Sequence, residues 1–204
     1  MYIYWYGQSS FKIQDKEVTV LLDPYSSRQA GLRGPNFKAD ITILDSEELS
    51  KQAQKDIKEG FLIDSPGEYE VKGVFVLGVK TGSNKIIYQI EVDGVKIGYL
   101  GEINKTLNDT ELDKVDNIDV LIIPVGDKKN TLGSKEAAEI IREIEPKIVI
   151  PSCYQISGLK NELESLDKFL KEIGVKKYDI DDKVRIVKKE LPENGMQVMV
   201  LKNS

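Results

Sequence analysis

The sequence predicts an α/β (α+β) protein in which two β-sheets pack face to face and helices cover their outer sides. Three observations support this fold class. Residues 1–100 consist mainly of short apolar or alternating segments typical of strands, with one helix-compatible run between them. After Gly101, strands and helices alternate, and two of these helices carry an apolar face. Because each apolar face must be buried against another layer, the pattern favours a layered sandwich.

The N-terminal part of the chain is expected to begin as an antiparallel meander. Turn-forming residues at 7–9 and 15–17 separate its strands. A loop rich in glycine, proline and asparagine follows at 31–36, and then a short buried strand and a helix that Ser46 could cap. The strands are predicted at residues 1–6, 10–14, 18–22 and 39–44, and the helix at residues 47–59.

The middle of the chain is expected to be entirely β. Lys72-Gly73 and Asp93-Gly94 are interpreted as hairpin turns, and the second is a strong signal because Asp-Gly suits a type I′ turn. The strands are predicted at residues 61–64, 67–71, 74–79, 85–92 and 95–100.

The last hundred residues are expected to alternate between helices and buried strands. Ser134 is the predicted N-cap of a helix in which Ala137, Ile140, Ile141 and Ile144 form one apolar face. The helices are predicted at residues 107–115, 134–145 and 159–173, and the strands at residues 119–124, 147–151, 183–188 and 196–201.

Composition narrows the class of protein. A chain of 204 residues can bury one sizeable core, so we expect a single domain spanning residues 1–204. No apolar run approaches the roughly 20 residues that span a bilayer, and the N-terminus lacks a signal-peptide pattern, so we expect a cytoplasmic protein without a membrane partner. The net charge of −5, with acidic and basic residues interleaved, argues against nucleic acid as a partner.

The chain contains no histidine and one cysteine, Cys153. An intrachain disulfide and a cysteine-rich zinc cluster are therefore excluded. No imidazole is available to bind a metal, move a proton or activate a nucleophile.

Six segments, in the same order along the chain, together resemble the metallo-β-lactamase fold. The resemblance is to its small single-domain branch, which includes ascorbate-6-phosphate lactonase-like proteins and zinc-dependent hydrolases. It implies a four-layer αββα sandwich with active-site loops at one edge of the two sheets. The matching segments are residues 5–11, 22–25, 66–74, 99–102, 119–126 and 148–154.

The resemblance also implies one or two zinc ions, which the family holds with a His-x-His-x-Asp-His loop, further histidines and a bridging aspartate. Another family histidine falls around residues 81–83, where no strong ligand stands. A lysine in the site would repel zinc, so we predict no zinc, no other cofactor and no catalytic residue. The degenerate family-site positions of this chain are Gln8, Ser46, Glu48, Ser50, Lys51, Glu102 and Cys153.

A substitute metal centre is the alternative, since hard cations prefer oxygen ligands. It would use Asp45, Glu48, Glu102 and Cys153, with Asp23 and Glu68 also available. The competing interpretation is that these are solvated loop carboxylates and a buried free cysteine.

Other candidate groups have simple explanations. Ser9 or Ser10 as a nucleophile would need a base that the sequence does not identify. The lysines of residues 126–133 could contact an anion, but an exposed charged loop explains them as well. The aromatic residues Trp5, Tyr6 and Phe11 are interpreted as packing residues.

Three functional hypotheses follow. The first is a non-catalytic pseudoenzyme that acts by binding an unknown protein or small-molecule ligand, with homo-oligomerisation possible. The alternative is a metal-dependent hydrolase of a lactone or phosphoester with a carboxylate/Cys metal centre, or with none. The third is a small-molecule sensor that uses the vacated cleft.

Overall fold

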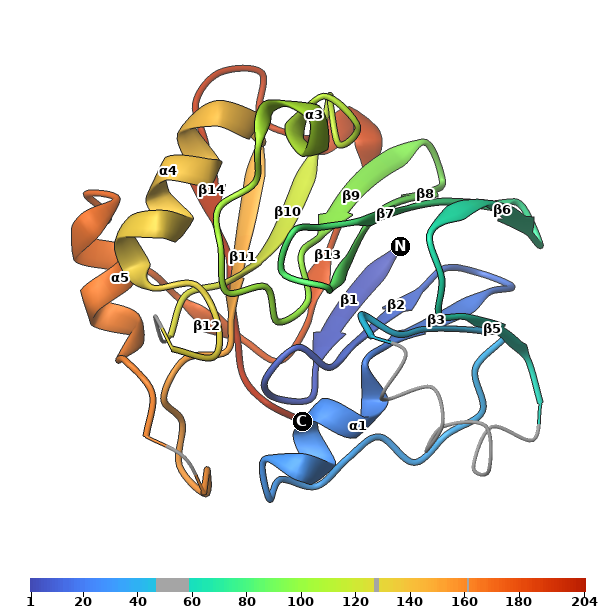
Figure 1. Cartoon of the computed structure of the whole chain (residues 1–204), viewed down its shortest axis with the longest axis horizontal. Coiled ribbons are helices and arrows are strands. Elements are labelled where there is room, and N and C mark those ends of the chain that lie inside the picture. Colours follow the sequence, from blue (N-terminus) through green and yellow to red (C-terminus); the bar gives the residue numbers. More distant parts are fainter. Residues whose placement is uncertain (47–58, 127–128, 161) are drawn as a thin grey trace.

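Two β-sheets form the centre of the protein, which we describe from a computed structural model (Figure 1). The structure describes residues 1–204 apart from 47–58, 127–128 and 161. The strand order is β13-β1-β2-β3-β4-β5 in the first sheet and β14-β11-β10-β9-β8-β7-β6 in the second. The predicted arrangement of two sheets is confirmed.

The first sheet begins with the predicted meander. Strands β1, β2 and β3 pair antiparallel, and β3, β4 and β5 pair parallel. A short helix, α1 (Pro24–Gln29), follows β3 and was not predicted. Proline suits the first position of a helix because its missing N–H would lack an intrahelical partner there. The strands are β1 (Tyr2–Trp5), β2 (Phe11–Gln14), β3 (Thr19–Leu22), β4 (Ile41–Ile43), β5 (Phe61–Ile63) and β13 (Val184–Arg185).

The second sheet combines three antiparallel pairs with a parallel half. Both predicted hairpin turns form, and their four residues, Lys72, Gly73, Asp93 and Gly94, all have positive φ, as a type I′ turn requires. Strands β9, β10, β11 and β14 then pair parallel. The strands are β6 (Gly67–Val71), β7 (Val74–Lys80), β8 (Ile86–Val92), β9 (Val95–Tyr99), β10 (Val120–Pro124), β11 (Ile148–Ser152) and β14 (Gln197–Val198).

The helices after residue 100 are shorter than predicted. An Asn108–Glu111 capping box starts α3, and Gly133 rather than Ser134 is the N-cap residue of α4. Helix α5 begins at Leu166 instead of residue 159 because the backbone N–H groups of Gln155 and Leu163 bond outside any helix, to the Glu164 carbonyl and the Gln155 side chain. The remaining elements are α3 (Asp109–Leu112), α4 (Ser134–Ile144), α5 (Leu166–Glu172), a 3₁₀ turn (Lys188–Glu190) and a small parallel sheet of β12 (Ile180–Asp181) and β15 (Val200–Leu201). The predicted helix at residues 47–59 falls almost wholly outside the described residues.

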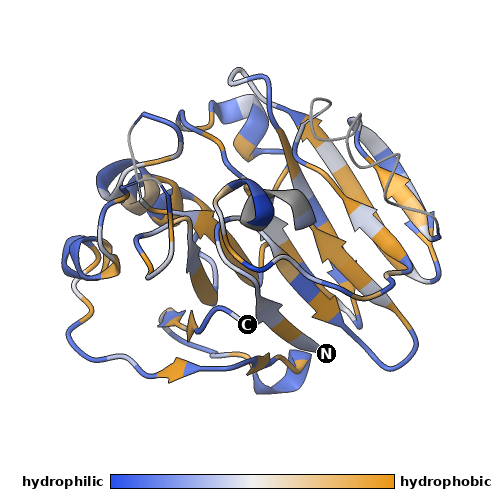
Figure 2. Ribbon diagram, turned by 90° about the horizontal axis from the view of Figure 1, so that it is seen from below, coloured by the Kyte–Doolittle hydropathy of each residue, from blue (hydrophilic) through white to orange (hydrophobic). Residues whose placement is uncertain are grey.

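Hydrophobic side chains hold the layers together. Helices α4 and α5 lie together on the side of the molecule that carries β10 and β11 (Figure 1), and α4 buries Ala137, Ile140 and Ile141. Apolar residues recur along the central strands, whereas the loops are mainly hydrophilic (Figure 2). The largest fully buried side chains include Trp5, Phe11, Tyr88 and Tyr99.

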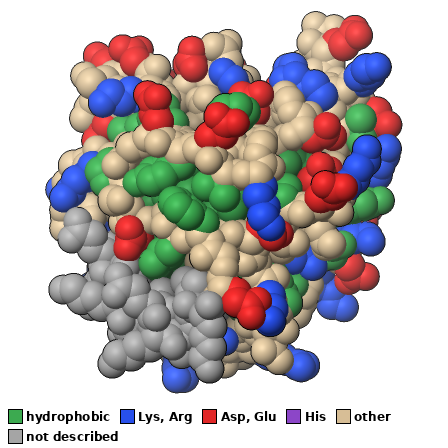
Figure 3. Space-filling model, turned by 90° about the vertical axis from the view of Figure 1, so that its right-hand side faces the viewer, with side chains coloured by type: hydrophobic (Ala, Val, Ile, Leu, Met, Phe, Trp, Pro, Cys, Tyr) green, Lys and Arg blue, Asp and Glu red, His purple; other side chains and the backbone are tan. Residues whose placement is uncertain are grey.

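The helices and one face of the surface can be described as follows. No described helix is long and apolar enough to cross a bilayer. On the side that carries β5 and β6, acidic and basic side chains are intermixed around hydrophobic ones (Figure 3). Phe61 and Phe75 are among the exposed large apolar residues of the protein.

Candidate functional site

Acidic side chains follow strands of both sheets and meet where those strands end. Asp23 follows β3, Asp45 follows β4 and Glu102 follows β9. The Asp45 amide donates to Asp23 Oδ1 at 2.8 Å, and the Glu102 amide donates to Asp45 Oδ2 at 2.9 Å. Asp23 and Asp45 are fully buried. These three residues, which we call the carboxylate cluster, join the two sheets.

Lys85 supplies a positive charge to this cluster. Its Nζ lies 2.9 Å from Asp45 Oδ1 and 3.0 Å from Asp45 Oδ2. Burial by itself lowers the pKa of Lys85, but the attraction of the Asp45 carboxylate outweighs it, so the pKa is raised. Lys85 is therefore an ammonium ion at neutral pH.

Asp23 has a different electrostatic environment. Burial, followed by repulsion from Asp45, raises its pKa well above the ordinary range, although hydrogen bonds from Tyr99 and the Asp45 amide oppose this. The Tyr99 hydroxyl lies close to Asp23 Oδ2 and 2.8 Å from the Ser9 carbonyl oxygen. A phenol has one proton, so Tyr99 donates to one of these two acceptors at a time. Burial and the charge of Asp45 shift Asp23 toward its protonated form.

Cys153 is a poor candidate for a nucleophile or a metal ligand. It follows β11, is fully buried, and has a positive φ of 54°. Burial, followed by the negative charge of Glu102, raises the pKa of its thiol well above the usual value. A thiol that stays protonated is neither a good nucleophile nor a good ligand.

The loop between β1 and β2 closes the cluster from another side. Ser9 Oγ donates to Glu102 Oε1 at 3.0 Å. Its neighbours Gln8 and Ser10 are also buried, and Gln8 Nε2 and Ser10 Oγ have no hydrogen-bond partner among the described residues. Buried polar atoms are normally paired, so these two groups are exceptions within the described part of the chain.

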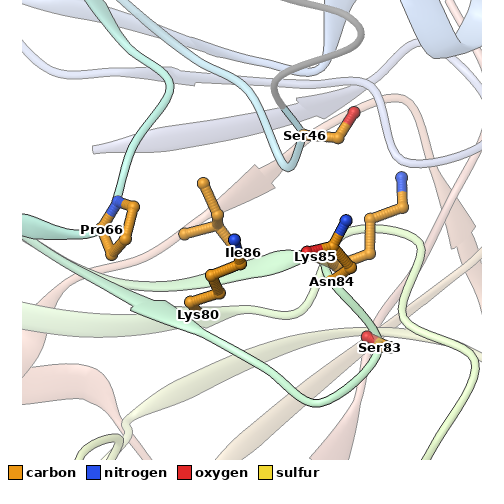
Figure 4. Close-up of a pocket in the computed structure, with 7 residues that line it drawn as sticks. All are labelled: Ser46, Pro66, Lys80, Ser83, Asn84, Lys85 and Ile86. Carbon is orange, nitrogen blue, oxygen red and sulfur yellow. The ribbon is translucent and has the colours of Figure 1, made fainter.

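A pocket of about 240 Å³ borders the Asp45–Lys85 ion pair. Figure 4 shows Lys85 extending across this pocket toward Ser46, the residue after Asp45. None of its described lining residues is acidic. Its lining residues are Ser46, Pro66, Lys80, Ser83, Asn84, Lys85 and Ile86.

The structure brings together only some of the predicted site residues. Gln8, Ser46, Asp45, Glu102 and Cys153 lie at or near the carboxylate cluster. Glu68 does not, because it is exposed on edge strand β6. Glu48, Ser50 and Lys51 lie outside the described residues.

Comparison with known proteins assigns the family. A family model described as "Beta-lactamase superfamily domain" matches residues 2–152. The chain belongs to the beta-lactamase superfamily. Within it, a crystal structure of a metallo-beta-lactamase superfamily protein from Thermotoga maritima is 30% identical, has a TM-score of 0.82 and covers 99% of this chain and 100% of its own. This likeness confirms the predicted metallo-β-lactamase fold.

Two superfamily relatives are similar over most of their length. A protein from Pyrococcus furiosus is 25% identical and covers 97% of this chain and 100% of its own. A relative from Thermococcus onnurineus is 26% identical, covers 72% of this chain and 82% of its own, and is named a metal-dependent hydrolase. These findings agree better with the hydrolase alternative than with a pseudoenzyme.

The names of the relatives correct one prediction. We predicted that the chain has no cofactor, and this is contradicted because relatives in the superfamily are named metal-dependent hydrolases. The prediction weighed the missing imidazoles too heavily, since carboxylate oxygens also bind divalent ions.

The donor groups of the described residues nevertheless do not fit a metal ion in the arrangement seen. Both Asp45 oxygens accept from the Lys85 ammonium, and both Asp23 oxygens are hydrogen-bonded. Within the described ranges, no three acidic or cysteine side chains are placed to coordinate one ion.

Sequence reasoning missed Lys85. Residues 81–83 contain no strong metal ligand, and Lys85, two positions further on, was not considered because lysine does not bind metal ions. The informative signal was a lysine whose ammonium group supplies positive charge at the site, rather than a side chain that binds a metal ion.

Proposed function

We propose that this chain is a hydrolase of the metal-dependent class and cleaves a small, negatively charged lactone or phosphoester beside the Asp45–Lys85 ion pair. One observation carries the proposal: the buried carboxylate of Asp45 is ion-paired with Lys85, and Lys85 lines a polar pocket together with Lys80. The names of the superfamily relatives support the reaction class.

The cost of burying these charges supports a functional role. Removing an ion from water costs several kcal/mol even after relaxation. The buried Asp45–Lys85 ion pair is weak evidence for stability alone, since replacing such a pair by apolar side chains is often neutral or stabilising. Clusters of titratable groups with shifted pKa values beside a pocket are typical of active sites.

The pocket determines the class of substrate. Its volume of about 240 Å³ is below the roughly 300–1,000 Å³ of pockets for drug-sized ligands, so it suits a small molecule or one charged group. Lys80 and Lys85 line it, together with the amide of Asn84 and the hydroxyl of Ser83. Ammonium, amide and hydroxyl donors together favour a phosphate or carboxylate group.

Glu102 is our candidate for the general base. It is partly exposed, whereas Asp23 and Asp45 are fully buried. The hydroxyl of Ser9 holds one of its oxygens, which fixes the orientation of the carboxylate. Glu102 also interacts electrostatically with Lys85, so a substrate anion held at Lys85 lies near the base.

The test compares the wild type with Glu102→Gln on a panel of lactones and nitrophenyl phosphoesters, with and without added Mn²⁺ or Zn²⁺. We expect the substitution to lower kcat/KM by about 100-fold or more, because a positioned general base contributes roughly 10²–10⁴ in rate. Glu68→Gln is the matched control, since this glutamate is exposed on β6, and it should retain wild-type activity. Equal rates for the wild type and Glu102→Gln on every substrate, or no turnover at all, would refute the proposed function.

A further inference from the structure

The outer face of the first sheet carries two lysines that lie over aromatic rings. Lys12 Nζ lies 3.9 Å from the centre of the Tyr4 ring and 5.0 Å from the centre of the Phe37 ring. Lys183 Nζ lies 4.7 Å from the centre of the Tyr2 ring. A cation–π contact of this kind attracts an ammonium group but does not neutralise its charge. We call these five residues the basic face.

The two ammonium groups of the basic face lack a counter-charge in the part of the chain that the structure describes. Burial, followed by repulsion from Lys183, lowers the pKa of Lys12. Among the described residues, no carboxylate lies within ion-pair distance of either lysine. Tyr2 and Phe37 are also 38% and 37% exposed. The basic face therefore combines accessible aromatic rings with uncompensated positive charge.

The outer face of the second sheet carries the opposite charge. Glu70 on β6, Phe75 on β7 and Glu91 on β8 lie directly opposite one another in the register of the strands. Residues in such positions share one face of a sheet. Glu68 and Leu77 form the neighbouring pair on β6 and β7. We call these five residues the acidic face.

The acidic face is open to contact. Phe75 is 51% exposed and borders a hollow of about 140 Å³, which Glu68, Leu77 and Glu91 also line. Within the described ranges, its three glutamates form no ion pair, even though Lys96 on β9 lies opposite Glu91. Helices α4 and α5 lie on the side that carries β10 and β11 instead (Figure 1). An exposed apolar side chain within a charged rim marks a candidate interaction surface.

The two faces point away from each other, because the sheets pack together through their inner sides. On β1, Tyr2 and Tyr4 alternate with the buried Ile3. On β7, the exposed Phe75 is followed by the buried Val76. Successive side chains of a strand point to opposite sides of its sheet. One chain therefore cannot bring its own two faces together, whereas a second copy of the chain can supply the missing charge to each.

We propose that this chain assembles head to tail, with the acidic face of one copy against the basic face of the next. The carboxylates then provide the counter-charge that Lys12 and Lys183 lack, and Phe75 packs among aromatic rings. Complementary charges also fix the orientation in which two copies meet. Because the two faces differ, the contact is heterologous, and each dimer keeps one free face of each kind for further copies. The inference does not depend on the proposed function.

Sedimentation equilibrium of the full-length protein at low ionic strength tests the inference. The weight-average mass of the wild type should rise with concentration to more than twice the mass of the monomer. Lys12→Gln/Lys183→Gln and Glu68→Gln/Glu70→Gln should each stay at the monomer mass, because each variant has lost one of the two faces. A wild type that remains monomeric would overturn the inference, even if another protein binds one of these faces.

Mixing the two variants tests whether the two faces contact each other. Each variant supplies the face that the other lacks, so an equimolar mixture should form a dimer and grow no further. A mixture that stays monomeric, or that grows beyond the dimer, would contradict a head-to-tail contact. Lys171→Gln/Lys176→Gln is the matched control, since it removes two exposed lysines outside both faces, and it should assemble like the wild type.

A salt titration uses only the wild type, so it holds even if a variant does not fold. Raising NaCl to about 1 M shortens the Debye length to about 3 Å, and the attraction between exposed charges is then largely screened. The mass of the assembly should fall toward that of the monomer. An unchanged or larger mass at high salt would contradict a contact that depends on charge.

Discussion

At the scale of single residues, the site depends on how closely the backbone surrounds Asp45. Gly101 combines a left-handed conformation with a side-chain position that Asp45 already fills. Gly73 has a similar φ of +75° in a hairpin turn, but nothing lies within 4 Å of its Cβ position. The two glycines therefore separate the cost of backbone conformation from the cost of a steric clash.

Substituting each glycine by alanine measures these two costs. Gly73→Ala should lower the free energy of unfolding by about 1 kcal/mol, the typical cost of a left-handed non-glycine residue. Gly101→Ala should cost roughly 2 kcal/mol more, because overpacking in a close-packed region adds about 1–3 kcal/mol. Urea unfolding followed by circular dichroism gives both values. Equal losses for the two variants would mean that the loop at Gly101 moves away without cost.

Which residues meet at the site was only partly predictable from the sequence. Glu102 and Cys153 were placed together by their positions in a family pattern, and Asp45 was named beside them in the alternative metal centre. The structure brings the three together. The protonation states of these residues could not be predicted from the sequence, because they depend on burial and on neighbouring charges that come from other strands. Asp23 and Asp45 are both aspartates that follow strands, yet among the described residues it is Asp45 that forms an ion pair with a lysine.

At the scale of elements, Asp119 connects several segments at the start of β10. Its carboxylate accepts from the Lys96 amide of β9 at 3.0 Å. It also accepts from Lys188 at 2.5 Å and forms an ion pair with Lys147 at 3.3 Å. Burial alone raises the pKa of Asp119, but the hydrogen bonds from Lys188 and the Lys96 amide outweigh it and lower the pKa.

The lowered pKa fixes the sign of a pH effect. A depressed folded-state pKa stabilises the protein above the unfolded-state value of about 3.9, and that stabilisation is lost as the pH falls through the folded-state value. Asp119→Asn should therefore reduce the free energy of unfolding by about 1–3 kcal/mol at pH 7. The difference from the wild type should persist at pH 5 and shrink below about pH 3.9. The measurement is urea unfolding at pH 7, 5 and 3.

The control for this prediction is Asp179→Asn, which changes an exposed aspartate. It should leave the free energy of unfolding unchanged at all three pH values. If the difference in free energy of unfolding between the wild type and Asp119→Asn stays constant down to pH 3, the charge of the carboxylate is not what stabilises the contacts at the start of β10.

Strands were easier to predict than helices, for a physical reason. Short apolar or alternating segments and Asp-Gly turns are signals that neighbouring residues carry. Strands β6 to β9 accordingly lie within a residue or so of the predicted ranges. Helix α5 was predicted too long because Leu163 matches the apolar spacing, whereas the hydrogen bond from its amide to the Gln155 side chain is set by a distant part of the loop. Helix α1 was missed because residues 22–25 were used only as one of the segments that resemble the family.

At the scale of the whole molecule, the C-terminal segment connects both sheets. Strand β14 pairs with β11 in the second sheet. A few residues later the Ser204 amide donates to the Trp5 carbonyl of β1 in the first sheet, at 2.9 Å. Between them, the buried Leu201 accepts a hydrogen bond from the Tyr154 hydroxyl at 3.3 Å. The segment therefore fastens the two halves of the sandwich to each other.

Leu201→Ala tests this connection. Truncating a buried leucine costs about 2–5 kcal/mol, so the unfolding midpoint should fall clearly. Trp5 is the single tryptophan and packs 4.9 Å from the Tyr154 ring, so its fluorescence reports the sheet interface. Fluorescence and circular dichroism should still give coincident transitions if the two halves unfold together. Lys202→Ala, at an exposed neighbouring position, is the control.

Two separated transitions in Leu201→Ala, or a midpoint equal to that of the control, would show that the segment does not fasten the sheets. The two-sheet architecture itself followed from the order of strands and helices along the chain. The fastening by a few C-terminal residues did not, because contacts between positions about two hundred residues apart leave no periodic signal.

Cys153 is the single cysteine of the protein and is completely buried behind β11. A thiol-specific reagent added to the native protein can reach it only when the end of this strand opens. The rate of modification therefore measures how often the centre of the sandwich opens, and the measurement requires no engineered label.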